Sequence, residues 1–188
     1  RPGYRRVDTS AIDWHWNGNG GMNEFDLASY FVTLSEQDRN DEIPDRFAGA
    51  NYCVGPEAII EIVPPEEMTY TAGANGITSF YSPAAKRLFG AKFTRYGTES
   101  KRHYDGAVRW LSPNYLTVSI ELVHPDNTGQ FMPETLNNAV ALGAYLSQMY
   151  AVPHVQHFDI TEKHCPRWWV DHPEDWKIFL NRIEAVSI

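Results

Sequence analysis

The chain has 188 residues, 43% of them hydrophobic and 21% charged, which is the size and composition of one globular domain with a buried core. Its formal net charge is -8 and it has no Lys/Arg run, which argues against nucleic-acid binding because phosphate contacts need clustered cations. No apolar run approaches the roughly 18 residues that a membrane-spanning helix needs, and no signal peptide is visible.

The first half of the chain predicts two strand regions and a helix. Residues 1–10 are expected to form an irregular N-terminal arm of a single domain that covers residues 1–188. Residues 11–16 alternate loosely and predict a short strand, and the glycine-rich run that follows predicts a turn. Apolar residues near helical spacing predict a helix over 24–36. Residues 50–63 predict two strands joined by a Gly-Pro turn, since Val, Ile and Tyr favour strands.

The second half predicts a long loop and then regular structure. Residues 64–114 are rich in Pro, Gly, Ser and Tyr and predict loop, apart from a short helix over 82–89. Strict alternation predicts a strand over 117–123. An apolar stripe predicts a helix over 134–150, with proline just before it, where a first helical turn tolerates proline. A short strand over 155–158 and a last helix over 174–186 complete a three-layer α/β domain.

Three residue types that bind zinc lie at or just beyond predicted strand ends: His15, His157 and Cys165. A catalytic zinc has three protein ligands and one open position for water. With 7 histidines in the chain, the spacing alone leaves open an alternative, in which the histidines are hydrogen-bonded and half-buried and the cysteine is a small buried residue. A single disulfide between Cys53 and Cys165 is also open.

Two further residues are candidates for chemistry. Glu121 lies among apolar neighbours in the predicted strand 117–123, and a partly apolar site would raise its pKa toward that of a general base. The alternative is an exposed edge glutamate. Lys163 could stabilise negative charge on a carbonyl oxygen, or be an ordinary solvated lysine. The motifs H-E-x-x-H, G-x-S-x-G and G-x-x-x-x-G-K are absent from the sequence.

Several segments resemble one known family in its own order along the chain. The segment 157–171, HFDITEKHCPRWWVD, closely resembles "HYDVTGKxCPRWFVD" of the zinc-dependent N-acetylmuramoyl-L-alanine amidases. The segment 112–123, SPNYLTVSIELV, with the HPDNTGQF that follows, resembles "PN…TIGIE…HPD.TGKF". The segment 11–20, AIDWHWNGNG, is similar to the opening strand "GIVIHWxxNP". This family is related to phage amidase-type lysozymes and to peptidoglycan recognition proteins.

The resemblance implies a central mixed sheet flanked by helices and a zinc site. His15, His157 and Cys165 match the zinc ligands. Glu121 matches the catalytic glutamate, and Lys163 matches the lysine just before the cysteine. On this reading Glu121 takes a proton from the attacking water and returns it to the leaving nitrogen, while zinc and Lys163 stabilise the oxyanion.

The sequence also departs from the family pattern. Asn51 stands where relatives carry a histidine, and Ala50 stands where the phage-lysozyme branch carries a catalytic tyrosine, so Glu121 would act without that tyrosine. Thr71 replaces a substrate-facing histidine, and the stretch 92–111 is longer than usual.

The implied function is hydrolysis of the amide between N-acetylmuramic acid and L-alanine in peptidoglycan, the expected partner. Tyr70, Thr71 and Trp168 are expected to line the substrate groove, although Trp168 could equally be core. The protein is expected to be secreted, periplasmic or cell-wall associated, or to be a phage endolysin that is released at lysis. No obligate protein partner is implied. Three alternatives stay open: a non-catalytic peptidoglycan-binding module, a zinc hydrolase of another cell-wall amide, and a structural zinc domain closed by His164 or Asp159.

Overall fold

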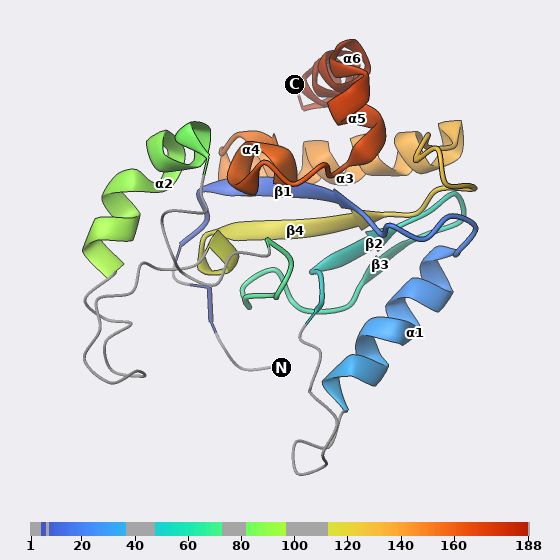
Figure 1. Cartoon of the computed structure of the whole chain (residues 1–188), viewed down its shortest axis with the longest axis horizontal. Helices are drawn as coiled ribbons and strands as arrows, with labels where there is room; N and C mark the ends of the chain where they lie inside the picture. The colour runs from blue at the N-terminus through green and yellow to red at the C-terminus, as the bar shows by residue number, and fades with distance from the viewer. Residues whose placement is uncertain (1–4, 7, 37–47, 73–81, 97–112, 188) are drawn as a thin grey trace.

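The computed structural model describes residues 5, 6, 8–36, 48–72, 82–96 and 113–187 (Figure 1). The strands are β1 Ala11–Trp16, β2 Tyr52–Val54, β3 Ile59–Glu61, β4 Thr117–Leu122 and β5 His154–Gln156. The helices are α1 Glu24–Ser35, α2 Pro83–Tyr96, α3 Pro133–Tyr150, α4 His157–Thr161, α5 Arg167–Asp171 and α6 Pro173–Val186, with a 3-10 turn at Pro113–Tyr115. Among these helices, none is long and apolar enough to cross a bilayer.

The strands form one five-stranded sheet in the order β3-β2-β4-β1-β5. Its inner pairs, β2 with β4, β4 with β1 and β1 with β5, are parallel, and the edge strand β3 is antiparallel to β2. The sheet is therefore mixed and carries helices, as the sequence predicted. The turn between β2 and β3 is closed by a hydrogen bond from the Gly55 N–H to the Ala58 carbonyl, at 3.0 Å.

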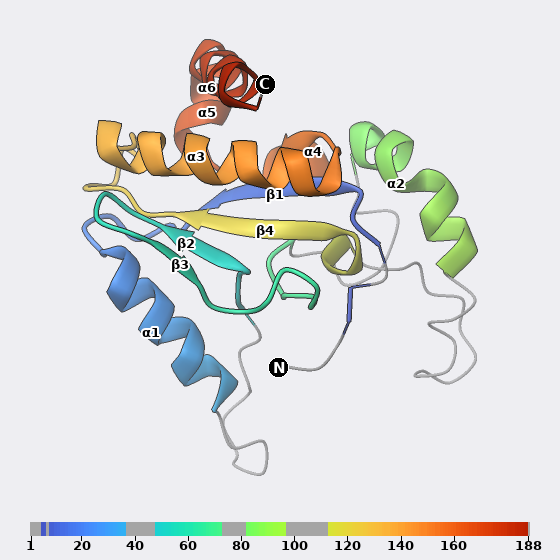
Figure 2. The ribbon, with the colours of Figure 1, turned by 180° about the vertical axis from the view of Figure 1, so that it is seen from behind.

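One face of the sheet is apolar and packs on α3, α5 and α6. Alternation along β1 puts Ile12 and Trp14 on this face, and the same parity along β4 adds Val118, Ile120 and Leu122. These residues form one core cluster with side chains of α3 and with Trp169, Phe179 and Ile183. Figure 2 shows α3 running along the strands. Burial of this large apolar face is the main force that holds the sheet to its helices.

The other face of the sheet carries polar side chains between two smaller apolar clusters. At one end, Leu27 and Phe31 of α1 pack on Cys53 of β2. At the other end, Phe89 of α2 and Ile160 of α4 pack near the start of β1. Figure 1 shows α1 and α2 at opposite ends of the sheet. The strip between these clusters keeps its polar side chains, which is where chemistry can take place.

The predicted elements are largely confirmed, with corrections near the end of β5. The predicted strand 155–158 is wrong in its bounds, because β5 ends at Gln156 and α4 begins at His157. The Asp159 carboxylate accepts the Gln156 backbone N–H at 2.8 Å and so starts the helix there. The predicted helix 82–89 continues to Tyr96. Of the predicted loop 64–114, residues 73–81 and 97–112 lie outside the described residues.

Candidate metal centre and active site

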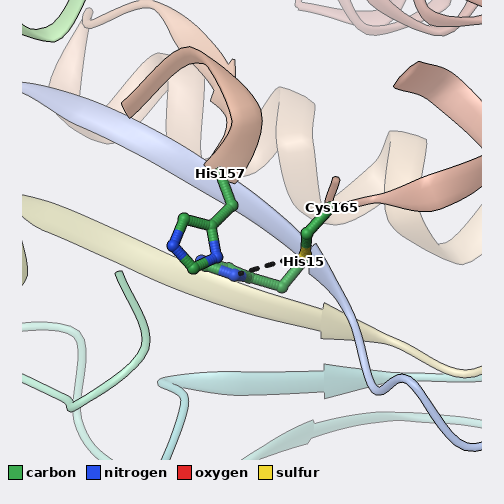
Figure 3. A group of neighbouring side chains, drawn as sticks. All are labelled: His15, His157 and Cys165. Atoms are coloured by element: carbon green, nitrogen blue, oxygen red, sulfur yellow. Dashed lines mark hydrogen bonds between the residues drawn. The ribbon is translucent and has the colours of Figure 1, made fainter. Parts of the chain in front are cut away.

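Three buried side chains from separate elements converge on the polar face. His15 comes from β1, His157 is the first residue of α4, and Cys165 lies between α4 and α5 (Figure 3). One nitrogen or sulfur atom of each lies within 4.8 Å of the others. The His15 Nδ1 atom is 3.8 Å from Cys165 Sγ, and the two imidazole rings are 4.6 Å apart. The convergence predicted from the sequence is therefore confirmed.

Local structure explains why these side chains meet. Alternation along β1 aims His15 at the polar face, since its neighbours Trp14 and Trp16 take the apolar face. Because β5 ends at Gln156, His157 projects from the first turn of α4 over β1 (Figure 3). A backbone hydrogen bond from the Phe158 N–H to the Cys165 carbonyl, at 2.9 Å, folds the following loop back against the start of α4.

The cysteines do not form a disulfide. Both Cys53 and Cys165 are free and buried. Cys53 lies on β2 against α1, whereas Cys165 lies against His15. The disulfide alternative that the sequence left open is wrong.

The donor set fits a metal ion. Neither ring nitrogen of His157 has a hydrogen-bond partner of ordinary geometry, although the Ala72 carbonyl lies near the ring. Buried polar atoms without partners cost free energy, which a bound cation would offset. Burial lowers the pKa of His15 to about 3 and, with a smaller effect of the neighbouring His15, that of His157 to about 3. Both imidazoles are therefore in the neutral form that binds metals.

The thiol and the geometry are consistent with the same reading. Burial raises the pKa of Cys165, so a metal would have to displace its proton, as metals do at thiolate sites. A tetrahedral zinc with bonds of about 2.0 to 2.3 Å keeps its ligand atoms roughly 3.5 Å apart. The 3.8 Å between His15 Nδ1 and Cys165 Sγ is close to that separation.

Glu121 lies next to this centre. The ladder between β1 and β4 pairs it with His15, so both side chains project from the same face. Its Oε2 atom has no hydrogen-bond partner, and burial raises the pKa of its carboxyl to about 8, with Lys163 acting in the opposite direction. Glu121 is therefore not the exposed edge glutamate of the alternative interpretation.

Lys163 lies exposed in the loop before Cys165. Its positive charge lowers the pKa of Glu121 and contributes to the lowered pKa values of His15 and His157. A cation that acts on all three groups lies near enough to act on charge that develops between them.

The structure adds Asp13, a site residue that the sequence analysis missed. Its Oδ2 atom is 2.7 Å from His15 Nε2, and both side chains are buried. Burial raises the pKa of Asp13 to about 8. The sequence signal that could have identified Asp13 is its position two residues before His15 in an otherwise apolar strand. Residues two apart in a strand lie on the same face of the sheet.

The segment that carries Tyr70 and Thr71 lies beside the centre. The Asn114 side chain accepts hydrogen bonds from the Thr71 and Ala72 N–H groups at 3.2 and 2.9 Å. The Ala72 carbonyl in turn lies near His157. Tyr70 is 39% exposed and so is available to a ligand. A role of Tyr70 and Thr71 in substrate binding stays a prediction.

Asn51, which departs from the family pattern, anchors the preceding loop. Its buried amide donates to the carbonyls of Val63, Pro64 and Glu67 at 3.1 to 3.2 Å and accepts from the Ser119 N–H at 3.0 Å. These bonds fasten the loop that leads to Tyr70 onto the middle of the sheet. Its neighbour Ala50 is fully buried in the cluster under α1.

Trp168 lies apart from the convergent triad. It packs against the core on the α3 face, donates a 2.7 Å hydrogen bond to Asp175 and stacks on His172. It also lines a hollow with side chains of α3 and α6. These contacts give it a packing role, and its predicted contact with substrate stays a prediction.

The two candidates for a fourth, closing ligand are engaged elsewhere. His164 is exposed and 2.8 Å from Asp171, and Asp159 starts α4. Over the part of the chain that the structure describes, the clustered donors are His15, His157 and Cys165 alone. A site with three ligands leaves a position open, which is the pattern of a catalytic rather than a structural zinc.

Comparisons with known sequences point to one family. The profile described as N-acetylmuramoyl-L-alanine amidase matches residues 7–168. Two proteins of Bacillus licheniformis, a probable N-acetylmuramoyl-L-alanine amidase and the N-acetylmuramoyl-L-alanine amidase CwlL, are 25% and 24% identical over 190 residues. Both matches cover 99% of this chain but 44% of the relative, so the chain spans less than half the length of these curated relatives.

Solved structures share the fold. PlyL is similar with a TM-score of 0.62 and 15% identity, over 96% of this chain and 86% of that one. A mutant endolysin from Bacillus subtilis is similar with a TM-score of 0.60 and 20% identity, over 97% of this chain and 90% of that one. The profile match extends over most of the domain and includes all three convergent side chains. The chain therefore belongs to the N-acetylmuramoyl-L-alanine amidase family.

Proposed function

We propose that this chain is a zinc-dependent amidase that hydrolyses the bond between N-acetylmuramic acid and L-alanine in peptidoglycan. The observation that carries the proposal is the open three-donor centre of His15, His157 and Cys165, with the Glu121 carboxyl in register beside it. Membership of the amidase family supports the choice of this amide among those of the cell wall.

His15, His157 and Cys165 would hold the zinc. When bound, zinc supplies Lewis-acid activation of water near neutral pH and polarises the amide carbonyl. Two neutral imidazoles and one thiolate leave the ion with net positive charge, which favours both effects. The buried surroundings of the three side chains strengthen their hold, because few waters compete for the ligand atoms.

Glu121 is proposed as the general base and then the general acid. It accepts a proton from the water that attacks the lactyl carbonyl carbon, and it delivers that proton to the L-alanine nitrogen as the C–N bond breaks. The second transfer is needed because an amide nitrogen leaves poorly until it is protonated. The positive charge of Lys163 lowers the pKa of Glu121, and a bound zinc would lower it further, toward the carboxylate form that starts the cycle.

Lys163 is proposed to stabilise the negative charge that develops on the carbonyl oxygen. Its exposure leaves the ammonium free to approach a bound substrate. Tyr70 and Thr71 would contact the glycan or the stem peptide, because their segment lies next to His157 and Tyr70 is half-exposed. The work of such an enzyme lies at the bacterial cell wall, whether it reaches the wall by export or at lysis.

The test is digestion of purified peptidoglycan by the zinc-loaded protein and its Glu121→Gln variant, with products identified by mass spectrometry. The expected products are stem peptides with a free L-alanine amino group and glycan strands with intact lactyl groups. Glu121→Gln should bind zinc as wild type does and lose nearly all turnover. Glu184→Gln, an exposed change on α6, is the matched control and should keep wild-type activity.

Three outcomes would contradict all or part of the proposal. Products cut within the stem peptide would assign the centre to another cell-wall amide. Binding of peptidoglycan without any product, by protein shown to contain zinc, would indicate a recognition module. Full activity of Glu121→Gln would remove Glu121 from its proposed role while leaving the zinc site in place.

A further inference from the structure

Asp13 is a buried carboxyl with a single strong contact. Its side chain is 0% exposed and lies on β1 between the apolar Ile12 and Trp14. Its Oδ2 atom is 2.7 Å from His15 Nε2, and its Oδ1 atom has no hydrogen-bond partner. A buried carboxyl that is only half satisfied costs folding free energy, so stability alone does not account for an acid at this position.

The contact has a direct consequence for the His15 ring. A neutral imidazole carries one N–H and one lone pair, and the group bound to one nitrogen decides which nitrogen keeps the lone pair. A cation held at Nδ1 would favour the carboxylate form of Asp13, and a carboxylate oxygen at 2.7 Å from Nε2 accepts its hydrogen bond from an Nε2–H. Nδ1, at 3.8 Å from Cys165 Sγ, is then left as the acceptor that faces the other two donors.

We propose that Asp13 is a positioning residue that holds His15 as its Nε2–H tautomer and turns Nδ1 toward the metal centre. This inference rests on the proposed zinc site. Histidine ligands in metal sites usually donate their second N–H to such a partner, which fixes the ring and strengthens metal binding. In the family pattern that resembles residues 11–20, the position of Asp13 is held by valine, so the contact belongs to this chain rather than to that pattern.

The second imidazole is held differently. Within the described residues, no carboxyl is hydrogen-bonded to the His157 ring, and the Ala72 carbonyl lies near that ring. Asp13 therefore orients one ligand from within the sheet. It lies two residues before His15 on the same strand, where the backbone cannot shift easily. This rigid placement predicts that loss of Asp13 affects metal affinity more than it affects the fold.

The experiment compares Asp13→Asn and Asp13→Val with wild type and with Ser119→Ala. Asparagine keeps an oxygen that can accept from Nε2–H, whereas valine removes the acceptor. Ser119 is the matched control, because it is buried on the same face and pairs with Asp13 across the ladder. Zinc dissociation constants are measured by competition with a chromogenic chelator, and the fold is checked by circular dichroism. The His15 tautomer is measured by long-range proton–nitrogen NMR on ¹⁵N-histidine protein.

Asp13→Val should weaken zinc binding about 10- to 100-fold, and Asp13→Asn should weaken it less. Ser119→Ala should bind zinc as wild type does. The NMR spectrum of wild type should show the proton of His15 on Nε2, and that of Asp13→Val should show a mixture of tautomers. Zinc affinity of folded Asp13→Val within threefold of wild type, or a wild-type proton on Nδ1, would overturn the inference. Failure of the wild type to bind zinc would instead overturn the proposed function. Should Asp13→Val not fold, Asp13→Asn and the wild-type spectrum decide the question.

Discussion

Single side chains decide which face of this sheet can carry chemistry. Along β1, Ile12 and Trp14 enter the apolar core, while Asp13 and His15 enter the polar strip. Within the described residues, the atoms left without hydrogen bonds include His157 Nδ1 and Nε2 and Glu121 Oε2, which all border the convergent centre. Since buried polar groups are normally satisfied, these open atoms are what a ligand bound at the centre would contact.

The role of Lys163 can be tested by Lys163→Ala. If Lys163 stabilises the oxyanion, kcat should fall roughly 100- to 1,000-fold, because losing one such donor costs about 3–4 kcal/mol. Zinc content should stay at the wild-type level, since Lys163 is not among the clustered donors. The control is Lys177→Ala, which removes an exposed lysine paired with Glu174 at 2.7 Å. Equal activity of the two variants would mean that Lys163 is an ordinary solvated lysine with no role in stabilising the oxyanion.

Elements with a clear apolar period were predictable from the sequence, and short elements set by local hydrogen bonds were not. Strict alternation predicted β4, and a long stripe predicted α3, because each buries one regular face. The boundary between β5 and α4 depends on a hydrogen bond from the Gln156 backbone N–H to the Asp159 carboxylate, which leaves no period in the sequence. α5 could not be predicted from periodicity either, since five residues are too few to show a helical pattern.

The site was predictable to a similar degree. His15, His157 and Cys165 could be named because the spacing of a whole motif resembles a family, although no local pattern brings them together. Asp13 could not be named in this way, because its partner is defined by strand alternation and its residue type departs from that family pattern. Trp168 shows the opposite case. It lies in the same sequence motif as Cys165, but its side chain packs against the core and donates a hydrogen bond to Asp175.

His154 on β5 joins three elements and should make stability depend on pH. Its Nδ1 accepts from Trp14 Nε1 on β1 at 2.9 Å, and its Nε2 is 2.8 Å from the Ser147 hydroxyl on α3. Burial lowers its pKa from 6.5 to about 4. A folded pKa below the unfolded value means that the unfolded chain binds the proton more readily. The stability contributed is therefore present above pH 6.5 and is lost as the pH falls toward 4.

The variant His154→Gln removes this titration and keeps an acceptor. Between pH 7 and pH 5, zinc-free wild type should lose up to about 2 kcal/mol more unfolding free energy than His154→Gln, since one pKa unit corresponds to about 1.4 kcal/mol. Urea unfolding at both pH values measures this difference, with the exposed His172→Gln as a control. Equal losses of unfolding free energy in wild type and His154→Gln would contradict the proposal that His154 causes this pH dependence.

For the molecule as a whole, the polar strip is the place where three segments from different parts of the chain meet. β1, α4 and the loop before α5 meet at the centre, and each contributes one donor. A metal held by all three would therefore cross-link segments that are far apart in the sequence. The proposed centre would then contribute to global stability as well as to catalysis.

Zinc removal should accordingly lower the stability of the whole domain. At a free zinc concentration of about 100 times the dissociation constant, zinc should add about 2.7 kcal/mol to the unfolding free energy. Thermal unfolding with zinc and after chelator treatment measures this shift, and His157→Ala should show little of it. An unchanged melting temperature at saturating zinc would mean that the metal binds no specific folded site.

The most direct test is the zinc K-edge X-ray absorption spectrum of the loaded protein. The account predicts one zinc per chain whose first shell contains one sulfur at about 2.3 Å and nitrogen or oxygen atoms at about 2.0–2.1 Å. The sulfur contribution should disappear in Cys165→Ser and persist in Cys53→Ser. A first shell without sulfur in the wild type, or one that loses sulfur only in Cys53→Ser, would contradict it.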